Sequence, residues 1–294
     1  MRMTLEQLRV FVAVAERQHV TQAAAALHIA QSAVSASIAA LEAHHGAKLF
    51  HRVGRGIELT EAGALFLPEA RAVLARASAA ELVLSELGGL KRGTLSIRAS
   101  HTIASYWLPR YLVAFRTMYA GIDLRLSVGN TAEVAAAVLA GTAELGFVEG
   151  AVDDPRLSSV RVARDQLVIV VGADHPWATA GNLTANQLCD SAWVMREAGS
   201  GTRSTFETAL ERFGIAPGSL PVALELPSNE SVRAAVEAGM GAAALSASVA
   251  ASSLEAGLLC KVAFDLPERE FCVLRNLERY RSGTADALLV IIAS

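Results

Sequence analysis

Apolar residues at the start of the chain recur every three or four positions. Leu5, Leu8, Phe11, Val12 and Ala15 follow this spacing and predict an amphipathic helix that Thr4 caps. Thr21 is placed to cap a second short helix at residues 22–27. A tight turn at residues 28–30 then leads into a third helix from Gln31 to Gly46. Three short helices with a tight turn between the last two predict a helix-turn-helix.

Residues 48–59 follow as two short apolar runs around a Gly/Arg tip, which predicts a basic hairpin, or wing. A long helix is then expected from Thr60 to about Leu87, kinked or interrupted near its start by Pro68. Its apolar residues form a heptad seam: Phe66, Ala70, Val73, Ala77, Ala80, Leu84 and Leu87. The seam could pack on its own domain. Since no other apolar segment nearby would cover it, the pattern favours pairing with a second chain, and a homodimer or homotetramer is expected.

Beyond a glycine-rich hinge at residues 88–93, short apolar strands alternate with helices. The strand candidates are residues 95–99, 122–128, 144–148, 167–171, 192–195, 222–226, 241–245 and 271–275, and the helix candidates are 103–118, 131–140, 202–213 and 231–238. This alternation predicts parallel sheets with helical crossovers, an α/β fold. The polar segment at residues 150–165 divides two similar halves, so we expect two lobes, with residues 266–294 returning to the first.

Composition narrows the class of protein. A length of 294 residues suggests two or three folding units, and 52% hydrophobic with 19% charged residues is typical of a globular protein rather than a disordered one. No continuous apolar stretch is long enough for a transmembrane helix, and charges at Glu6, Arg9 and Glu16 interrupt any secretory signal. A cytoplasmic location is therefore expected. Three widely spaced cysteines suggest reduced thiols, and neither a metal site nor a cofactor is expected.

Charge is distributed unevenly along the chain. Residues 1–92 hold 10 Lys/Arg against 8 Asp/Glu, whereas the remainder holds 16 against 21. This asymmetry permits a polyanionic partner at the N-terminus but is too small to demonstrate one.

Small polar residues stand between a strand and a helix at four places: 100–102, 129–131, 199–203 and 228–231. Each turn alone is more often a simple helix cap. Together, at the carboxyl ends of strands, they favour a ligand site between the lobes, with the helix N-termini and Arg203 suited to an anion. The expected effector-binding residues are Ser100, His101, Thr102, Asn130, Thr131, Ser200, Thr202, Arg203 and Asn229. His101 also fits a turn histidine with its hydrogen bonds satisfied.

Catalytic signatures are poor. The chain has no Gly-x-Ser-x-Gly elbow, no His-Glu-x-x-His pair and no Walker A loop, so we do not expect an enzyme. The adjacent His44 and His45 point to different faces of a helix and suit a solvated surface better than a metal site.

The N-terminal residues closely resemble the winged helix-turn-helix of LysR-type transcriptional regulators. The matching positions are Gln31-Ser32-Ala33-Val34-Ser35, Ile38, Leu41-Glu42, Gly46, Leu49-Phe50, Arg52, Arg55 and Leu59-Thr60-Glu61-Ala62-Gly63. The second half looks most like the branch that holds regulators of sulfur assimilation and carbon fixation, which typically senses small anions. Its matching segments are residues 99–103, 108–109, 127–131, 146–150 and 196–203.

The resemblance implies a winged helix-turn-helix at 1–60, a linker and dimerisation helix with a hinge at 61–92, and an α/β effector domain of periplasmic-binding-protein type at 93–294. Lobe one would span about 93–163 and 266–294, and lobe two about 164–265. We expect Gln31, Ser32 and Ser35 to enter the major groove of double-stranded DNA. Arg52 and Arg55 on the wing would contact the backbone or minor groove.

Some positions depart from the family. It usually has Ser at the position of Ala30 and Pro at that of Ser32, and basic or amide residues where this chain has Ala36, Ser37, Ala39 and Ala40. Loss of the N-cap at Ala30 costs about 0.5–2 kcal/mol unless Ser32 partly substitutes. Short side chains also leave fewer groups for reading bases.

Two hypotheses follow. The first is a ligand-responsive transcription factor whose small effector, an anion, binds between the two lobes. The second is a cytoplasmic small-molecule binding or enzymatic α/β protein with an N-terminal dimerisation module. The first explains Gln31, Ser35, Arg52 and Arg55 together, whereas no catalytic constellation supports the second.

Overall fold

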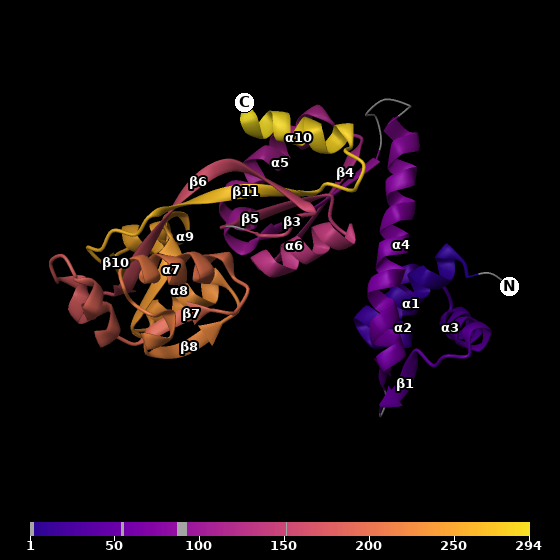
Figure 1. Cartoon of the computed structure of the whole chain (residues 1–294), viewed down its shortest axis with the longest axis horizontal. Coiled ribbons are helices and arrows are strands. Elements are labelled where there is room, and N and C mark those ends of the chain that lie inside the picture. The colour runs from indigo at the N-terminus through magenta and orange to yellow at the C-terminus, as the bar shows by residue number, and fades with distance from the viewer. Residues whose placement is uncertain (1–2, 54–55, 87–92, 151) are drawn as a thin grey trace. The chain divides into compact units, whose positions relative to one another are not determined.

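The computed structural model describes residues 3–53, 56–86, 93–150 and 152–294 (Figure 1). The chain divides into two compact units, with the division between residues 86 and 93. The N-terminal unit contains α1 (Leu5–Arg17), α2 (Val20–Leu27), α3 (Gln31–His45), β1 (Phe50–Val53), β2 (Gly56–Leu59) and α4 (Glu61–Glu86). The expected three helices, antiparallel hairpin and long helix are all present, so the winged helix-turn-helix prediction is confirmed.

Helix ends in this unit follow local sequence in most places. Thr4 caps α1 in a reciprocal capping box with Gln7, as expected, and Gly46 ends α3 in the left-handed conformation. The expected cap at Thr21 is wrong, because α2 begins at Val20 with His19 in the N-cap position. Gln18 takes the left-handed conformation that ends α1, and the chain re-enters a helix almost at once.

Aromatic packing ties α4 to the other helices. The Phe11 ring lies 5.3 Å from that of Phe50 and 4.9 Å from that of Phe66, centroid to centroid. Ala70, one turn further along α4, is fully buried in the same core. The expectation that nothing in the chain covers the start of the heptad seam is therefore wrong: Phe66 and Ala70 pack within their own unit.

The rest of the seam differs from its start. Val73 is 42% exposed and Ala80 is exposed, while Ala77 is half-buried. The side chain of Leu84 and all of Leu87 lie outside the described residues. α4 also runs as one helix through Pro68, so the expected interruption is absent from its described length.

The C-terminal unit is a two-lobed α/β structure. Its strands are β3 (Gly93–Ser100), β4 (Ile122–Gly129), β5 (Leu145–Glu149), β6 (Leu157–Gly172), β7 (Trp193–Arg196), β8 (Val222–Leu226), β9 (Ala242–Ser246), β10 (Leu259–Lys261) and β11 (Glu268–Asn276). The α-helices are α5 (Pro109–Met118), α6 (Thr131–Ala140), α7 (Gly201–Arg212), α8 (Asn229–Glu237), α9 (Ala247–Glu255) and α10 (Gly283–Ala293). Short 3-10 turns lie at Pro176–Ala178, Ala185–Asp190 and Pro217–Ser219.

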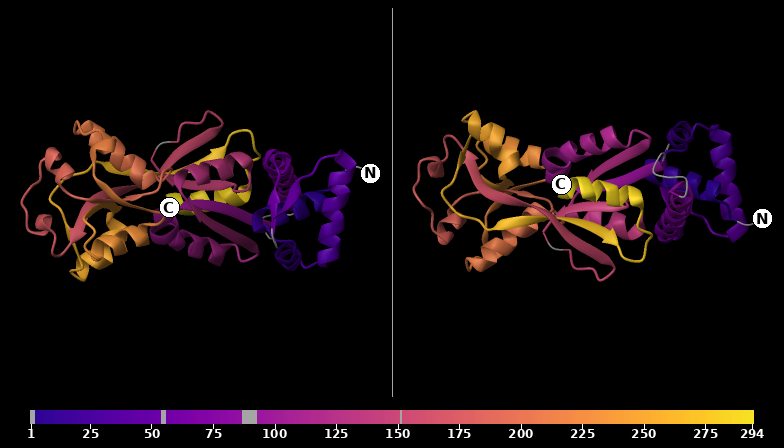
Figure 2. Two further views of the ribbon diagram at one scale, coloured as in Figure 1. Left: turned by 90° about the horizontal axis from the view of Figure 1, so that it is seen from below. Right: turned by 90° about the horizontal axis from the view of Figure 1, so that it is seen from above.

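The strands follow the order β4-β3-β5-β11-β6-β9-β7-β8, with β10 also beside β6. The sheets are mixed, which corrects the expectation of parallel sheets: β11 runs antiparallel to β5 and β6, and β6 antiparallel to β9. β6 is a single 16-residue strand that covers most of the segment expected to be a polar divider. As Figures 1 and 2 show, β6 and β11 are the strands that run from one lobe to the other.

Each lobe has helices on both faces of its sheet, although the edge strands β4 and β8 are largely exposed, and alternate residues of a strand point to opposite sides. In lobe two, Leu167 and Ile169 face the layer with α7, while Val168 and Val170 face α8 and α9. In lobe one, α5 and α10 cover one face and α6 the other (Figure 1). The C-terminal helix therefore packs on the first lobe.

The predicted helix at residues 103–118 is in two parts. Residues Ile103–Trp107 form a π-helical turn, in which the Leu108 N–H donates to the Ile103 carbonyl at 2.9 Å, and α5 begins at Pro109. Proline at the first position of a helix needs no hydrogen-bond acceptor, so the wide turn ends where α5 begins. Wide turns of this kind frequently occur at functional sites.

No single helix among the described residues is long and apolar enough to cross a membrane. α2 and α3 taken together have the length and the apolar composition of a membrane-spanning segment, but they are bent by 108° at their junction.

Candidate functional site

The start of α3 presents polar side chains to solvent. Gln31, Ser32 and Ser35 are exposed, whereas Val34 between them is fully buried. The N-cap residue Ala30 forms no side-chain hydrogen bond, and no other side chain among the described residues, Ser32 included, caps this terminus. The positive end of the helix dipole is therefore presented to solvent beside one amide and two hydroxyl side chains, a chemistry suited to phosphate oxygens and base edges.

The wing is fixed to the helices by backbone contacts. Phe50–Val53 pairs with Gly56–Leu59 in an antiparallel register, and the Ile57 N–H donates to the Gln18 carbonyl at 3.2 Å. Arg52 is exposed on β1, as a phosphate contact requires. Arg55 lies outside the described residues.

Glu42 joins the third helix to the wing, a role that the sequence pattern does not reveal. Its buried carboxylate accepts the N–H groups of Leu49 at 2.9 Å and Phe50 at 3.2 Å, and the Lys48 ammonium at 2.7 Å. Burial alone would raise the pKa of Glu42, but these three donors outweigh it and lower the pKa. The ionised carboxylate thus sets the position of β1 relative to α3.

In the C-terminal unit, several predicted effector residues meet across the lobes. The Asn229 amide at the start of α8 donates to the Thr102 hydroxyl of lobe one at 2.9 Å, and both side chains are buried. Asn130, at the start of α6, hydrogen-bonds to Glu197 of lobe two. Thr131 donates to the backbone carbonyl of Glu149 at 3.3 Å.

Two glycines permit this approach. Gly199 has φ +86°, in the left-handed region, and a Cβ there would lie 3.3 Å from Asn130 Oδ1. A Cβ on Gly201 would lie 2.5 Å from both the Glu149 carbonyl oxygen and Thr131 Oγ1, closer than real Cβ atoms come. The N-terminus of α7 therefore sits directly against lobe one only because position 201 has no side chain.

Ser100 ends β3 beside these contacts. Its side chain is 3% exposed, and its hydroxyl has no hydrogen-bond partner among the described residues. Ser200, also buried, occupies the N-cap position of α7 without making a capping bond from its side chain. His101 is half-buried. A buried hydroxyl without a partner costs free energy unless a ligand or water satisfies it.

Buried charges surround the same loops, and none of them was expected from the sequence. Arg196 at the end of β7 pairs with Glu197 through two nearly parallel hydrogen bonds, Nε to Oε2 at 2.8 Å and Nη2 to Oε1 at 2.9 Å. Its third nitrogen, Nη1, donates to Asn229 Oδ1 at 2.7 Å. Burial alone would raise the pKa of Glu197, but the Arg196 guanidinium outweighs it and lowers that pKa.

A second buried pair lies where the strands cross between lobes. Arg269 on β11 donates from Nε to Asp165 on β6 at 2.7 Å and from Nη1 to the Thr202 hydroxyl at 3.0 Å. Ser246 donates to the other Asp165 oxygen at 2.7 Å. The carboxylate of Glu149 lies 3.9 Å from Arg269 Nη2. Thr202 is thus held by the strands that connect the lobes.

Arg203 lies in a different setting from the one expected. Its guanidinium donates to Glu207 at 2.8 Å, to Glu225 at 2.5 Å and to the carbonyl of Arg196 at 3.1 Å. Two carboxylates already balance this charge, so the contacts of Arg203 do not favour a direct role in holding an anion.

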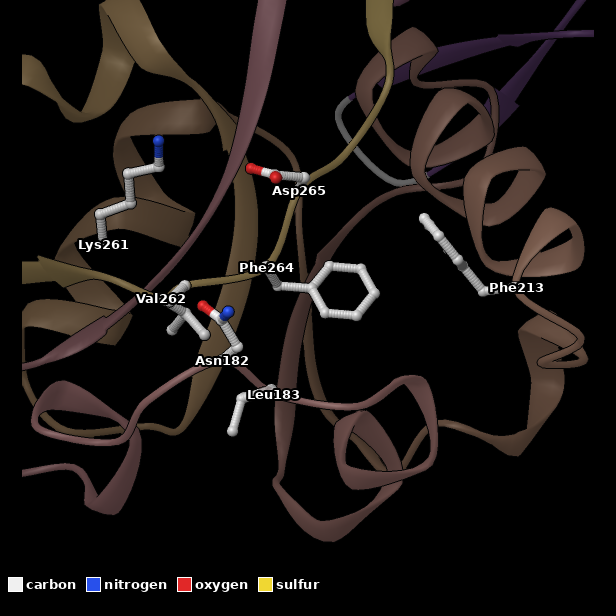
Figure 3. Close-up of a pocket in the computed structure, with 8 residues that line it drawn as sticks. Asn182, Leu183, Phe213, Lys261, Val262, Phe264 and Asp265 are labelled. Carbon is white, nitrogen blue, oxygen red and sulfur yellow. The ribbon is translucent and has the colours of Figure 1, made fainter.

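The arrangement offers hydroxyls, amides and a paired guanidinium, which can bind a small polar ligand by hydrogen bonds. No group of three His, Cys, Asp or Glu side chains within the described part of the chain could hold a metal ion. A separate cavity of about 380 Å³ lies in lobe two, lined by Phe213, Phe264 and neighbouring residues (Figure 3). Phe213 follows the C-terminus of α7, the opposite end from Thr202, so this cavity is not the predicted site.

Family models match both units. Residues 5–64 match the bacterial regulatory helix-turn-helix protein, lysR family, and residues 88–294 match the LysR substrate binding domain.

Relatives extend along most of the chain. An uncharacterised HTH-type transcriptional regulator YeiE of Escherichia coli is 37% identical over 270 residues, 91% of this chain and 88% of the relative. The RuBisCO operon transcriptional regulator of Allochromatium vinosum is 34% identical, covering 84% of this chain and 80% of its own length.

Solved structures share the fold. The LysR family regulator CbnR, at 23% identity, superposes with a TM-score of 0.74 and covers 99% of this chain and 98% of its own. The regulatory domain of CcmR from Synechocystis PCC6803, solved in complex with 2-PG, is 27% identical with a TM-score of 0.63. It covers 69% of this chain and 96% of its own.

Proposed function

The chain belongs to the LysR family of transcriptional regulators, and from this premise we propose that its third helix and wing bind DNA under the control of a small anion held between its two lobes. The functional division that we propose is 1–60 for DNA binding, 61–92 for linkage and pairing, and 93–294 for effector binding. Within the last, lobe one takes about 93–163 and 266–294, and lobe two about 164–265.

The uncapped, exposed start of α3 supports the DNA-binding half of this proposal. Gln31 supplies an amide that can pair with the edge of a base, and Ser32 and Ser35 supply hydroxyls beside it. Arg52 and Arg55 on the wing would hold the backbone or minor groove. The alanines that follow on α3 add no long side chain, so base reading depends chiefly on the first turn of the helix.

One observation carries the effector-binding half: the buried Ser100 hydroxyl lacks a partner within the described residues, close in sequence to Thr102, which reaches Asn229 of the other lobe. Thr202, at the N-terminus of α7, accepts a hydrogen bond from Arg269 on β11, one of the two strands that connect the lobes. The complex of CcmR with 2-PG supports a small effector for this kind of domain. Only a ligand that contacts both lobes distinguishes their open and closed arrangements, which is what a regulatory signal requires.

The exposed part of the heptad seam supports pairing of two chains. Val73 and Ala80 are exposed and Ala77 is half-buried, so the described residues of the N-terminal unit do not bury this part of the seam. The alanines at positions 77 and 80 permit close approach of a second α4. We propose a homodimer through this segment, or a homotetramer built from it.

Calorimetric titration of sulfite, sulfate, phosphate and small carboxylates tests the effector site. The wild type is expected to bind at least one of them, and the double variant Thr102→Ala, Thr202→Ala is expected to bind it about tenfold more weakly, since each hydrogen bond that is removed is worth about 0.5–1.5 kcal/mol. The matched Thr102→Ser, Thr202→Ser variant keeps both hydroxyls and retains binding. Equal affinities in the wild type and the alanine variant, or no binding by the wild type, would rule the site out.

A further inference from the structure

The Nε and Nη2 edge of the Arg196 guanidinium is occupied by a side chain of the protein itself. Arginine binds carboxylate, sulfate or phosphate groups best through two parallel N–H bonds, and Glu197 occupies the Nε and Nη2 edge of Arg196 in this way. The guanidinium is 3% exposed and the glutamate side chain 23%, so the carboxylate is the more accessible member of the pair. An entering anion would therefore meet the glutamate before the arginine.

Other cations near the inter-lobe residues are also matched with carboxylates. Arg203 has Glu207 and Glu225, and Arg269 has Asp165. Arg269 pairs with Asp165 on the neighbouring strand β6, where β6 and β11 connect the lobes, and Arg203 is held by two acids. The Arg196 edge is closed by one side chain on the loop that follows β7. Of these three, Arg196 is the cation that a single side-chain movement would release.

Arg196 also connects directly to the cross-lobe contact. Its Nη1 holds the oxygen of Asn229, whose amide nitrogen donates to Thr102 of lobe one. A ligand on the Nε and Nη2 edge would leave this second bond in place. The guanidinium can thus take an external anion and keep its contact with Asn229.

We propose that Glu197 is an internal competitor for the effector: its carboxylate occupies the edge of Arg196 that an anionic effector takes, and the effector must displace it. This inference rests on the proposed anion site and assigns it a specificity-determining residue. A planar or tetrahedral oxyanion can reproduce the two parallel bonds that Glu197 gives up, whereas a monatomic anion such as chloride cannot. The competitor therefore selects carboxylate, sulfate and phosphate groups over the halide ions of the cell.

The test is calorimetric titration of sulfate, acetate and chloride into the full-length chain at constant ionic strength. Glu197→Gln keeps the size of the side chain but removes its charge, and Glu197→Ala removes the competitor altogether. Both variants are expected to bind sulfate and acetate at least tenfold more tightly than the wild type, and to bind chloride more tightly as well, because the carboxylate that keeps chloride from Arg196 is gone. Glu270→Gln is the matched control: Glu270 pairs with Arg161 on the exposed surface, so this variant makes the same charge change away from Arg196.

The outcomes separate the two proposals. If the wild type binds sulfate or acetate and both Glu197 variants bind it equally or more weakly, the competitor role is overturned while the anion site stands. Thermal unfolding shows whether each Glu197 variant is folded. If one of them is not, the affinity of the folded variant is the one compared with the wild type. If no form of the chain binds either oxyanion, the anion site and this inference both fail. If Glu270→Gln also bound the oxyanions more tightly, the change in net charge alone would explain the result, and the role of Glu197 as a competitor would be overturned.

Discussion

In each unit a single glutamate carboxylate positions part of the proposed binding site: the wing in the N-terminal unit and Arg196 in the C-terminal unit. Glu42 accepts three hydrogen bonds from residues 48–50, at the start of the wing. Glu197 forms an ion pair with the buried Arg196. Neither role could be predicted from the sequence, because a glutamate on a helix or beside an arginine is usually solvated. Only the fold brings residues 48–50 back over α3, or buries the end of β7. Both glutamates nevertheless lie in segments that resemble the family.

Glu42→Gln is expected to lower the free energy of unfolding of the N-terminal unit by about 1.5–3 kcal/mol, the usual worth of hydrogen bonds to a charged group. The folded-state pKa of Glu42 lies below its unfolded value, so its contribution is fully present above about pH 4.5 and is lost as the pH falls through the folded pKa. Chemical unfolding of the wild type and the variant between pH 3 and 7 checks this. A stability difference that stays constant down to pH 3 would contradict it.

Arg52→Ala with Arg55→Ala is expected to weaken binding to all DNA sequences and to lower the slope of log affinity against log salt by about one for each phosphate that is no longer neutralised. Gln31→Ala is instead expected to change sequence preference, at about 1–3 kcal/mol for the base concerned. Fluorescence anisotropy on a selected site and on its single-base variants, at several salt concentrations, measures both. Unchanged binding by both variants would refute the assignment.

At the scale of elements, hydrophobic periodicity and capping residues predict those helix ends and strands that the neighbouring residues in the sequence determine. The capping box at Thr4, the Gly46 terminus and most strand cores follow the expected pattern because their signals lie within a few residues. The first half of β6 escapes prediction because Leu157 is its one buried residue and polar and apolar residues are mixed along it, so that only its pairing with β11 makes it a strand. The heptad seam of α4 packs on its own unit at Phe66 and Ala70, and its later part is proposed to pair two chains. Periodicity alone cannot tell these two roles apart.

The two uses of the seam predict different mutant behaviour. Ala77→Glu places a charge on the half-buried part, so it is expected to halve the mass in solution and weaken operator binding while leaving the N-terminal unit folded. Ala70→Glu buries an unpaired charge in the core and is expected to unfold that unit instead. Light scattering and circular dichroism distinguish them. An Ala77→Glu variant with unchanged mass and affinity would mean that the seam does not pair chains.

At the scale of the whole molecule, the chain joins a DNA-binding unit to a domain whose two lobes share the strands β6 and β11. The two-lobed α/β architecture could be predicted, because strand and helix segments alternate visibly along the sequence. The mixed strand directions and the buried ion pairs at the crossing could not, since they depend on which distant strands become neighbours. Arg269 and Asp165, 104 positions apart, meet only through that pairing.

The most direct test of the account measures DNA binding and anion binding together. The affinity of the full-length chain for a selected DNA site is determined at constant ionic strength, with and without the anion that calorimetry identifies, at a concentration near its wild-type dissociation constant, where a site that binds tenfold more weakly stays largely empty. The wild type is expected to change its DNA affinity by at least threefold, while the Thr102→Ala, Thr202→Ala variant at the same anion concentration does not change. DNA affinity that is unaffected by an anion bound to the wild type, or an equal change in both proteins, would contradict control of the DNA-binding unit from the site between the lobes.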